Sequence, residues 1–271
     1  MSDPAAVTDD LLDDLLDDLC EEGEELDRLV GELGDGDWAL PTPAPGWTVA
    51  HQIAHLAWTD RAALLAATDP EAFVAEVEKA MAAPDRFVDE GAEEGAKLPP
   101  VELLAAWRIG RERLQDVLRA APAGARFPWY GPPMSVSAMA TARLMETWAH
   151  AQDVADALGV TRVPTARLRH VAWIGARARD YAYLVRGLPA PAAPFRIELD
   201  GIDGKLWAYG PEDAPQKVTG PALDFCLLVA QRVHRADTAL VAHGPDAEHW
   251  LTIAQAFAGP AGGGRDPQGA R

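Results

Sequence analysis

Hydrophobic residues in the first 160 positions recur at the three- and four-residue spacing of amphipathic helices. In the first such stretch, leucines alternate with acidic residues, and we interpret the acidic run as a solvated helix face. Thr48 and either Ser135 or Ser137 are candidate N-caps for two of the helices. The pattern predicts long helices over residues 8–33, 49–67, 101–121 and about 136–159, and a shorter one over 70–82. Four long helices joined by irregular loops favour a four-helix bundle.

Other stretches break this pattern. Residues 84–100 are acidic, contain glycine and end in Pro-Pro, which predicts a surface loop. After Gly159 one more helix is expected over residues 165–187, and then two short strands around an Asp203-Gly204 turn. Val218 is expected in another strand, Gly220-Pro221 opens a helix over 222–240, and a last helix fits 246–258. These elements predict a helical domain over residues 1–160, a smaller α+β domain over 161–258 and a disordered tail over 259–271.

Composition narrows the classes of function. The 271 residues carry a net charge of −18, and so acidic a surface repels phosphate backbones and anionic lipids, which excludes nucleic acid and membranes as expected partners. No apolar run approaches the roughly 20 residues of a membrane span, and the N-terminus lacks the basic start of a signal peptide. We therefore expect a cytoplasmic protein. Cys20 and Cys226 lie far apart in predicted helices, which favours reduced, buried thiols over a disulfide.

Two of the predicted helices carry side chains that can bind a metal ion. Arg143, Glu146, His150 and Asp153 follow steps of three and four residues, so they share one helix face. On the second helix, His51 and His55 form an i, i+4 pair beside an apolar face. Either pattern alone is also typical of a solvent-exposed face. Together they place three of the seven histidines on two bundle helices, where metal sites are built from facing side chains.

Such a combination would supply two imidazoles and one carboxylate to zinc or a similar divalent ion and leave one position open for chemistry. Asp60, Arg143 and Asp153 lie about one turn from the candidate ligands, where they could orient them, clamp a substrate or simply face solvent. The stretch "RFPWYGPPM" comes just before the last bundle helix and has two interpretations: a rim for an organic substrate, or a loop anchored by buried aromatic rings. Its candidate residues are Arg126, Phe127, Trp129 and Tyr130.

Two stretches resemble a known family. "PGWTVAHQIAHLAW" and, about ninety residues later, "ARLMETWAHAQDVADALG" resemble the actinobacterial mycothiol-dependent maleylpyruvate isomerases, which belong to the DinB/YfiT-like metal-binding four-helix bundles. The family pattern falls on Trp47, His55, Glu146 and His150. The resemblance therefore implies His55, Glu146 and His150 as metal ligands. It makes His51 the weaker alternative, because the family ligand directly precedes a leucine.

The resemblance extends to the second domain, since "GPALDFCLLVAQRVHRADT" resembles the closing helix of the family's sterol-carrier-like domain. It implies a divalent-metal enzyme that uses a low-molecular-weight thiol such as mycothiol on a small electrophilic metabolite, by isomerisation or thiol transfer. No stretch matches a maleylpyruvate-binding basic residue, so the substrate does not carry over. A thiol-independent hydrolase or specialised-metabolism enzyme and a non-catalytic ligand-binding protein remain alternatives. A homodimer is the default expectation.

Overall fold

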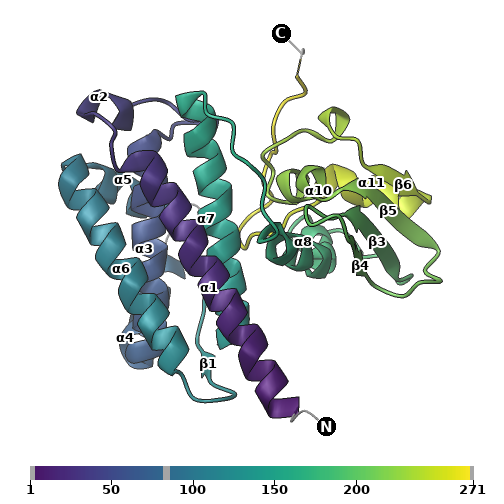
Figure 1. Cartoon of the computed structure of the whole chain (residues 1–271), viewed down its shortest axis with the longest axis horizontal. Helices are drawn as coiled ribbons and strands as arrows, with labels where there is room; N and C mark the ends of the chain where they lie inside the picture. Colours follow the sequence, from purple (N-terminus) through teal and green to yellow (C-terminus); the bar gives the residue numbers. More distant parts are fainter. Residues whose placement is uncertain (1–3, 82–85, 269–271) are drawn as a thin grey trace. The chain divides into compact units, whose positions relative to one another are not determined.

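The structure is a computed structural model that describes residues 4–81 and 86–268. The chain divides into two compact units, Met1–Thr161 and Arg162–Arg271 (Figure 1). The first unit is helical and the second combines helices with a small sheet. The predicted fold class, a helical bundle followed by a smaller α+β part, is confirmed.

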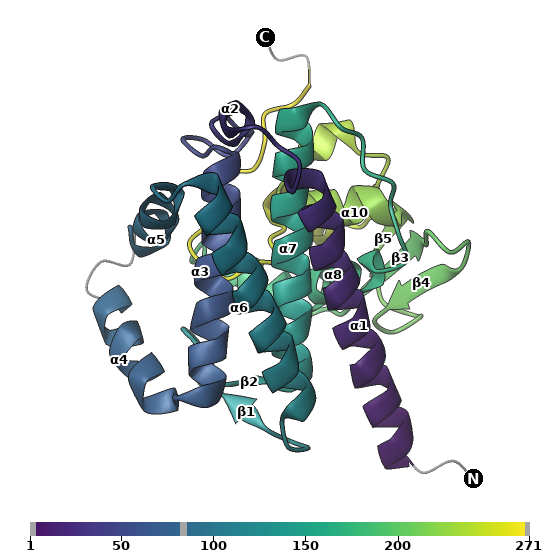
Figure 2. The same cartoon turned by 60° about the vertical axis from the view of Figure 1, so that its left-hand side comes forward.

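Four long helices form the first unit. They are α1 (Pro4–Val30), α3 (Val49–Thr68), α6 (Pro100–Ala120) and α7 (Val136–Leu158). Helix α3 packs against α6 and α7, and α1 packs against α7 and α6, as Figures 1 and 2 show. Their apolar stripes meet in a core that includes Leu26, Ile53, Trp107 and Val154. This is the bundle that the hydrophobic spacing predicts.

The ends of the bundle helices follow from local sequence. The Ser135 hydroxyl accepts a hydrogen bond from the Ala138 backbone N–H at 3.2 Å and so caps α7, while Gly159 ends that helix in the left-handed conformation at φ 67°. Thr48 precedes α3, and its backbone N–H donates to Nδ1 of His51 at 3.2 Å. The acidic side chains Asp13, Asp14 and Asp17 of α1 are exposed, which confirms the solvated face.

The prediction of a loop over residues 84–100 is wrong where the structure describes this stretch. Residues 84 and 85 lie outside the described residues, but α5 (Phe87–Ala96) follows the short helix α4 (Pro70–Met81). The glycines of α5 do not mark turns. A Cβ at Gly95 would lie 2.8 Å from Cβ of Ala54, and a Cβ at Gly91 would lie 3.1 Å from the Trp58 ring. These glycines let α5 approach α3 closely.

The remaining elements of the first unit are short. Helix α2 (Asp35–Trp38) lies between α1 and α3, and its Trp38 is buried. Strands β1 (Arg126–Phe127) and β2 (Met134–Ser135) form a small antiparallel pair before α7, which was not predicted. None of the helices in residues 4–81 and 86–268 combines the length and the apolar character that crossing a membrane requires.

The second unit contains a four-stranded sheet in the order β4-β3-β5-β6, in which β3 and β5 are parallel and the other pairs antiparallel. The strands predicted around Asp203-Gly204 and at Val218 are present. Strand β6 was missed. The strands are β3 (Phe195–Asp200), β4 (Leu206–Tyr209), β5 (Gln216–Pro221) and β6 (Val241–His243).

The predicted helices of the second unit are shorter than expected. The helix predicted over 165–187 is divided at Ala178 into α8 (Leu168–Arg177) and α9 (Arg179–Leu184), and the guanidinium of Arg179 donates to the carbonyls of Ala193 and Pro191. The helix predicted over 222–240 ends as α10 (Ala222–Val229), since Gln231 adopts φ 58° and donates to the Ala254 carbonyl. A 3₁₀ turn, η1 (Arg235–Asp237), and α11 (Pro245–Ile253) follow.

Candidate metal centre

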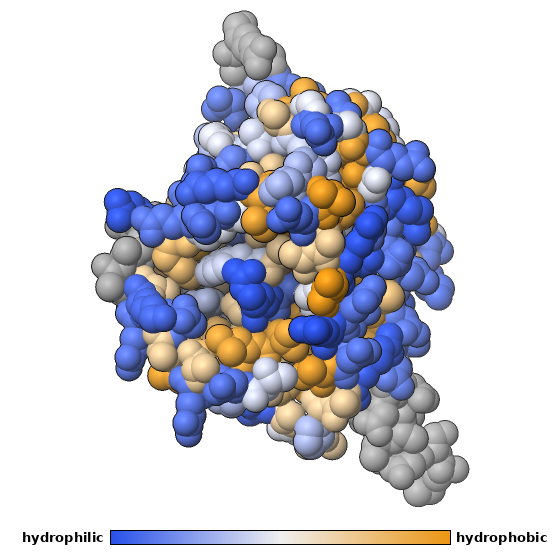
Figure 3. Space-filling model, turned by 90° about the vertical axis from the view of Figure 1, so that its left-hand side faces the viewer, coloured by the Kyte–Doolittle hydropathy of each residue, from blue (hydrophilic) through white to orange (hydrophobic). Residues whose placement is uncertain are grey.

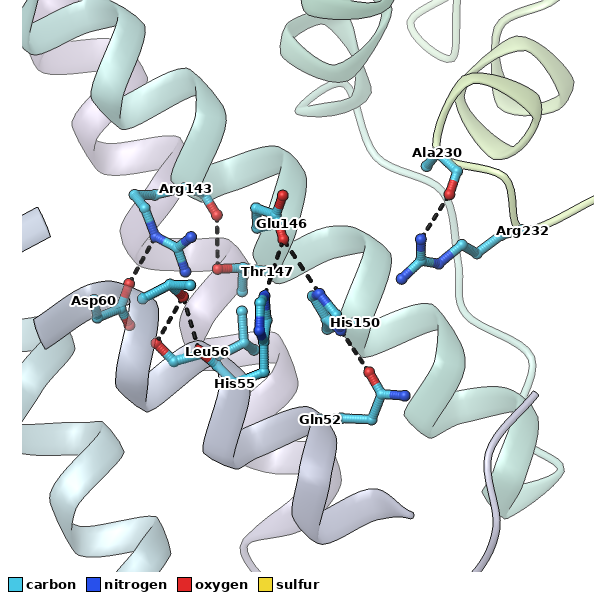
Figure 4. A network of polar contacts seen from close by, with 11 residues as sticks. Gln52, His55, Leu56, Asp60, Arg143, Glu146, Thr147, His150, Ala230 and Arg232 are labelled. Atoms are coloured by element: carbon cyan, nitrogen blue, oxygen red, sulfur yellow. Dashed lines mark hydrogen bonds and ion pairs between the residues drawn. The ribbon is translucent and has the colours of Figure 1, made fainter. Parts of the chain in front are cut away.

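Facing side chains of α3 and α7 bring together three of the residues singled out by the sequence (Figure 4). His55 lies on α3, and Glu146 and His150 lie one turn apart on α7. One ligand atom from each of the three residues lies within 4.8 Å of the others. Nε2 of His55 is 3.4 Å and Nε2 of His150 is 3.2 Å from the same oxygen, Oε2 of Glu146. We name these three residues the His–Glu–His cluster.

The polar stripe of α7 does not face solvent. Arg143 is 3% exposed, His150 is 8% exposed and Asp153 is completely buried, while Glu146 is partly buried. Charged side chains are almost never buried without a partner, so this stripe requires compensating interactions. The interpretation of the stripe as a solvated helix face is therefore wrong.

A chain of hydrogen bonds fixes the orientation of His150. Thr42 Oγ1 donates its proton to the Trp47 carbonyl at 2.9 Å, so it accepts from Nε2 of Gln52 at 2.8 Å. The amide oxygen of Gln52 then faces Nδ1 of His150, at 2.5 Å. Because an amide oxygen only accepts, Nδ1 of His150 carries a proton, and Nε2 is the nitrogen that faces Glu146.

This arrangement favours a cation between the side chains. Burial raises the pKa of the Glu146 carboxyl, but hydrogen bonds from His150 and His55 outweigh burial and hold the pKa well below its ordinary value. Glu146 is therefore ionised at neutral pH. Because the single proton of neutral His150 is on Nδ1, its Nε2 would present a lone pair to this carboxylate, so either a second proton on His150 or a metal ion must lie between the two groups. Two imidazoles and one carboxylate are a donor set that fits a divalent ion such as zinc.

His51, the alternative ligand, lies outside the His–Glu–His cluster. Its Nε2 is 2.9 Å from a carboxylate oxygen of Glu93 on α5, and its Nδ1 bonds Thr48. Both ring nitrogens of His51 thus have partners, one just before α3 and one on α5. Between the two histidines of the i, i+4 pair, the geometry favours His55.

Asp60 and Arg143, two of the candidate catalytic residues, contact each other. Nε of Arg143 donates to Oδ1 of Asp60 at 2.9 Å, and both side chains are buried (Figure 4). The pair joins α3 to α7 beside the cluster and neutralises both charges, which favours a role in positioning the two helices over a role in clamping a substrate. Asp153, the third candidate, is buried on α7 three residues after His150.

Trp47 lies over the imidazoles of the cluster. Its ring stacks on His150 with centroids 5.9 Å apart and lies 5.4 Å from the His55 ring. Its indole N–H donates to Oδ1 of Asp89 on α5 at 3.0 Å. Sequence reasoning missed both Gln52 and Asp89. Gln52 could have been predicted as a partner of the cluster, because it lies one turn before His55 on α3. Asp89 could not, because it lies in the stretch that was interpreted as a loop.

The aromatic stretch before α7 is partly anchored and partly exposed. Phe127 is buried, and Trp129 stacks on Phe73 of α4 with centroids 5.6 Å apart. Tyr130 also contacts Phe73, at 5.3 Å. Arg126 is exposed and donates to the carbonyl of Pro133. The loop interpretation accounts for Phe127 and Trp129, while Tyr130 lines a cavity beside α3, α4 and α5.

The fold and the cluster define a class of protein: a four-helix bundle with a His–Glu–His cluster between two helices, followed by an α+β unit. Residues 19–155 match the family model described as mycothiol maleylpyruvate isomerase N-terminal domain. The chain belongs to this family. A second model, described as wyosine base formation, matches residues 191–243, which include β3, β4, β5 and α10.

Individual relatives agree with this assignment. An uncharacterized protein of Mycobacterium tuberculosis, found in strains H37Rv and CDC 1551, is 56% identical over 244 residues, which cover 90% of this chain and 95% of the relative. Crystal structures of the mycothiol-dependent maleylpyruvate isomerase and of a histidine-to-alanine mutant both match with a TM-score of 0.59. They are 18% and 19% identical to this chain and cover 87% of it and 95% of their own chains, which shows a shared fold.

Proposed function

We propose that the protein is a divalent-metal enzyme that uses a low-molecular-weight thiol of the mycothiol type on a small electrophilic metabolite, by isomerisation or thiol transfer. The observation that supports it most is the convergence of His55, Glu146 and His150 within 4.8 Å, with Nε2 of His150 turned toward the carboxylate. Family membership supports the thiol. When bound, a divalent ion with an open position favours the ionised form of a thiol near neutral pH.

The chain's own residues hold the site in shape. The amide oxygen of Gln52 accepts a hydrogen bond from the Nδ1 proton of His150, and the Asp60–Arg143 pair holds α3 against α7. Trp47 covers the imidazole rings with an apolar surface that restricts water. Reversible addition of a thiol to a conjugated double bond would allow rotation and, after loss of the thiol, isomerisation. Addition without its reversal, or displacement of a leaving group, would give thiol transfer.

An external thiol is favoured over the protein's own cysteines. Burial raises the pKa of the Cys226 thiol, so it stays protonated at neutral pH, and its Sγ bonds the Leu168 carbonyl within the second unit. Cys20 lies on α1, which does not supply any of the three cluster residues. Neither cysteine is in the His–Glu–His cluster.

The first test is metal content, measured by elemental mass spectrometry on tag-free protein. We expect about one divalent ion, most simply zinc, per wild-type chain and loss of most of it in His55→Ala, Glu146→Ala and His150→Ala. The matched control is His51→Ala, which should keep its metal because His51 pairs with Glu93. Absence of metal from wild type after reconstitution with several ions, or its loss from His51→Ala alone, would contradict the proposal.

The thiol is tested separately on cobalt-substituted protein. Addition of mycothiol should produce a near-ultraviolet sulfur-to-cobalt charge-transfer band in wild type and no such band in His150→Ala. Full cobalt loading without any spectral change at saturating thiol would leave a metal protein that does not use this thiol.

A further inference from the structure

A cavity of about 520 Å³ lies in the helical unit, between α3, α4, α5 and the loop before α7. On the side of the molecule where α4, α5 and α6 lie, Figure 3 shows apolar side chains gathered around a hollow in a largely hydrophilic surface. Trp58 connects the cavity to the His–Glu–His cluster, because it lines the cavity and its ring centroid lies 6.0 Å from that of His55. The three cluster residues do not line it.

The wall of the cavity is aromatic. Tyr130 contacts Phe87 at 5.2 Å, Phe73 at 5.3 Å and Trp58 at 6.3 Å between ring centroids, and Phe87 meets Trp58 edge to face at 5.2 Å. These four residues come from α3, α4, α5 and the loop before α7. Rings held against one another in this way form a preformed surface for a planar apolar group, and the volume is in the usual range of small-molecule sites.

Among the charged residues that line the cavity, one basic side chain has no ion-pair partner in the described chain. Lys79 pairs with Glu76 at 2.6 Å, and Glu90 pairs with Arg86 at 3.0 Å. Arg61 on α3 lines the same cavity and makes no ion pair with any residue of the described chain. An unpaired guanidinium at the mouth of an aromatic cavity, on a chain of net charge −18, provides a local site for a carboxylate.

The phenol of Tyr130 adds a neutral polar group to the wall. Burial, with a smaller effect of Glu76, raises the pKa of Tyr130 to about 12, so the hydroxyl keeps its proton at neutral pH. Within residues 4–81 and 86–268 this hydroxyl has no hydrogen-bond partner. It is therefore free to bond a polar substituent of a ligand.

We propose that this cavity binds a small aromatic carboxylate, with its ring packed against the wall formed by Trp58, Phe73, Phe87 and Tyr130 and its carboxylate on Arg61. That the ligand is a substrate of the neighbouring cluster rests on the proposed function, whereas the binding itself does not. A substrate of this class would carry an aromatic ring next to its electrophilic group. The ring would pack against the aromatic wall of the cavity while the electrophilic group reaches the neighbouring His–Glu–His cluster.

The test is isothermal titration calorimetry of the full-length protein with 2-naphthoate and with its neutral analogue 2-naphthamide. We expect wild type to bind 2-naphthoate, and Arg61→Gln to weaken 2-naphthoate about tenfold while leaving 2-naphthamide nearly unchanged, because only the charged ligand uses the guanidinium. The matched control is Arg113→Gln on α6, another exposed helical arginine, which should bind both probes as wild type does.

A second variant tests the location. Leu65→Trp places a large ring in the cavity wall and should abolish binding of both probes while the circular dichroism spectrum stays unchanged. Equal affinity of wild type, Arg61→Gln and Leu65→Trp for 2-naphthoate, or no binding by wild type, would overturn the proposal. Chelator-treated protein should bind 2-naphthoate as well as the metal-loaded form. Absence of metal from the His–Glu–His cluster would therefore contradict the proposed function but not the binding of aromatic carboxylates. A metal-loaded protein that does not bind 2-naphthoate would contradict only the proposal for the cavity.

Discussion

The two histidines of the cluster are oriented by different means. His150 is fixed by hydrogen bonds through Gln52 to Thr42, and the completely buried Gln52 faces its Nδ1. His55 has a buried Nδ1 with no hydrogen-bond partner in the described chain, and its ring is held by contacts with Trp47 and Trp58 at 5.4 and 6.0 Å. The tautomer of His150 therefore depends on one side chain, which makes Gln52 a specific target.

We predict that Gln52→Leu lowers the affinity for zinc about 10- to 100-fold, the usual effect of removing a hydrogen-bond partner of a metal-binding histidine. Gln52→Glu keeps an oxygen acceptor opposite Nδ1 and should retain an affinity closer to wild type. Competition with a chromophoric chelator measures both values, and nitrogen-15 NMR of the His150 ring reports the tautomer. Equal affinities in wild type and both variants, with the tautomer unchanged, would show that Gln52 does not position His150.

The residues of the cluster were predictable because their spacing along two helices is local information. Glu146 and His150 share an α7 face at an i, i+4 spacing, and the choice of His55 over His51 came from the family pattern. The Asp60–Arg143 pair and the bond from Trp47 to Asp89 were not predictable, since each joins residues more than 40 positions apart. Only the packing of α3 against α7 and α5 brings them together.

At the level of elements, glycines in α5 serve helix packing. Gly95 faces Ala54 of α3, where a Cβ would lie 2.8 Å from Cβ of Ala54. Gly110, within α6, offers a matched contrast, because a Cβ there meets no atom within 4 Å. Alanine at either position gains helix propensity, but only at Gly95 does it also create a steric clash.

The two substitutions should therefore change stability in opposite directions. We expect Gly110→Ala to raise the free energy of unfolding by up to about 1 kcal/mol, and Gly95→Ala to lower it by about 1–2 kcal/mol, since overpacking exceeds the gain in propensity. Urea denaturation followed by circular dichroism measures both. If Gly95→Ala stabilises the protein as much as Gly110→Ala does, α5 does not pack closely against α3.

These contacts also explain which elements the hydrophobic pattern could predict. The long bundle helices bury a continuous apolar stripe, so their periodicity is strong enough to be seen in sequence. Helix α5 was missed because its glycines resemble turn signals unless the facing Ala54 and Trp58 are known. At the break between α8 and α9 and after the end of α10, the side chains of Arg179 and Gln231 bond the distant carbonyls of Ala193 and Ala254, and the local pattern gives no information about these partners.

For the whole molecule, the division into two units places the candidate metal site in one unit only. All three residues of the His–Glu–His cluster lie within Met1–Thr161. The second unit has its own buried residues around the sheet, including Ile197, Phe225 and Trp250. A ligand stabilises only the cooperative unit that binds it, so metal should act on one part of the unfolding profile.

We predict two transitions in differential scanning calorimetry, of which only one depends on metal. Zinc at 100 times its dissociation constant adds about 2.7 kcal/mol to the unit that binds it, which for a domain of this size raises its Tm by roughly 5–10 °C. Chelator should reverse that shift and leave the other transition in place, and His150→Ala should show the lower Tm with or without zinc. A single transition that shifts with zinc would mean that the two units unfold together. Two transitions in wild type that do not shift with zinc would show that metal does not stabilise the folded protein.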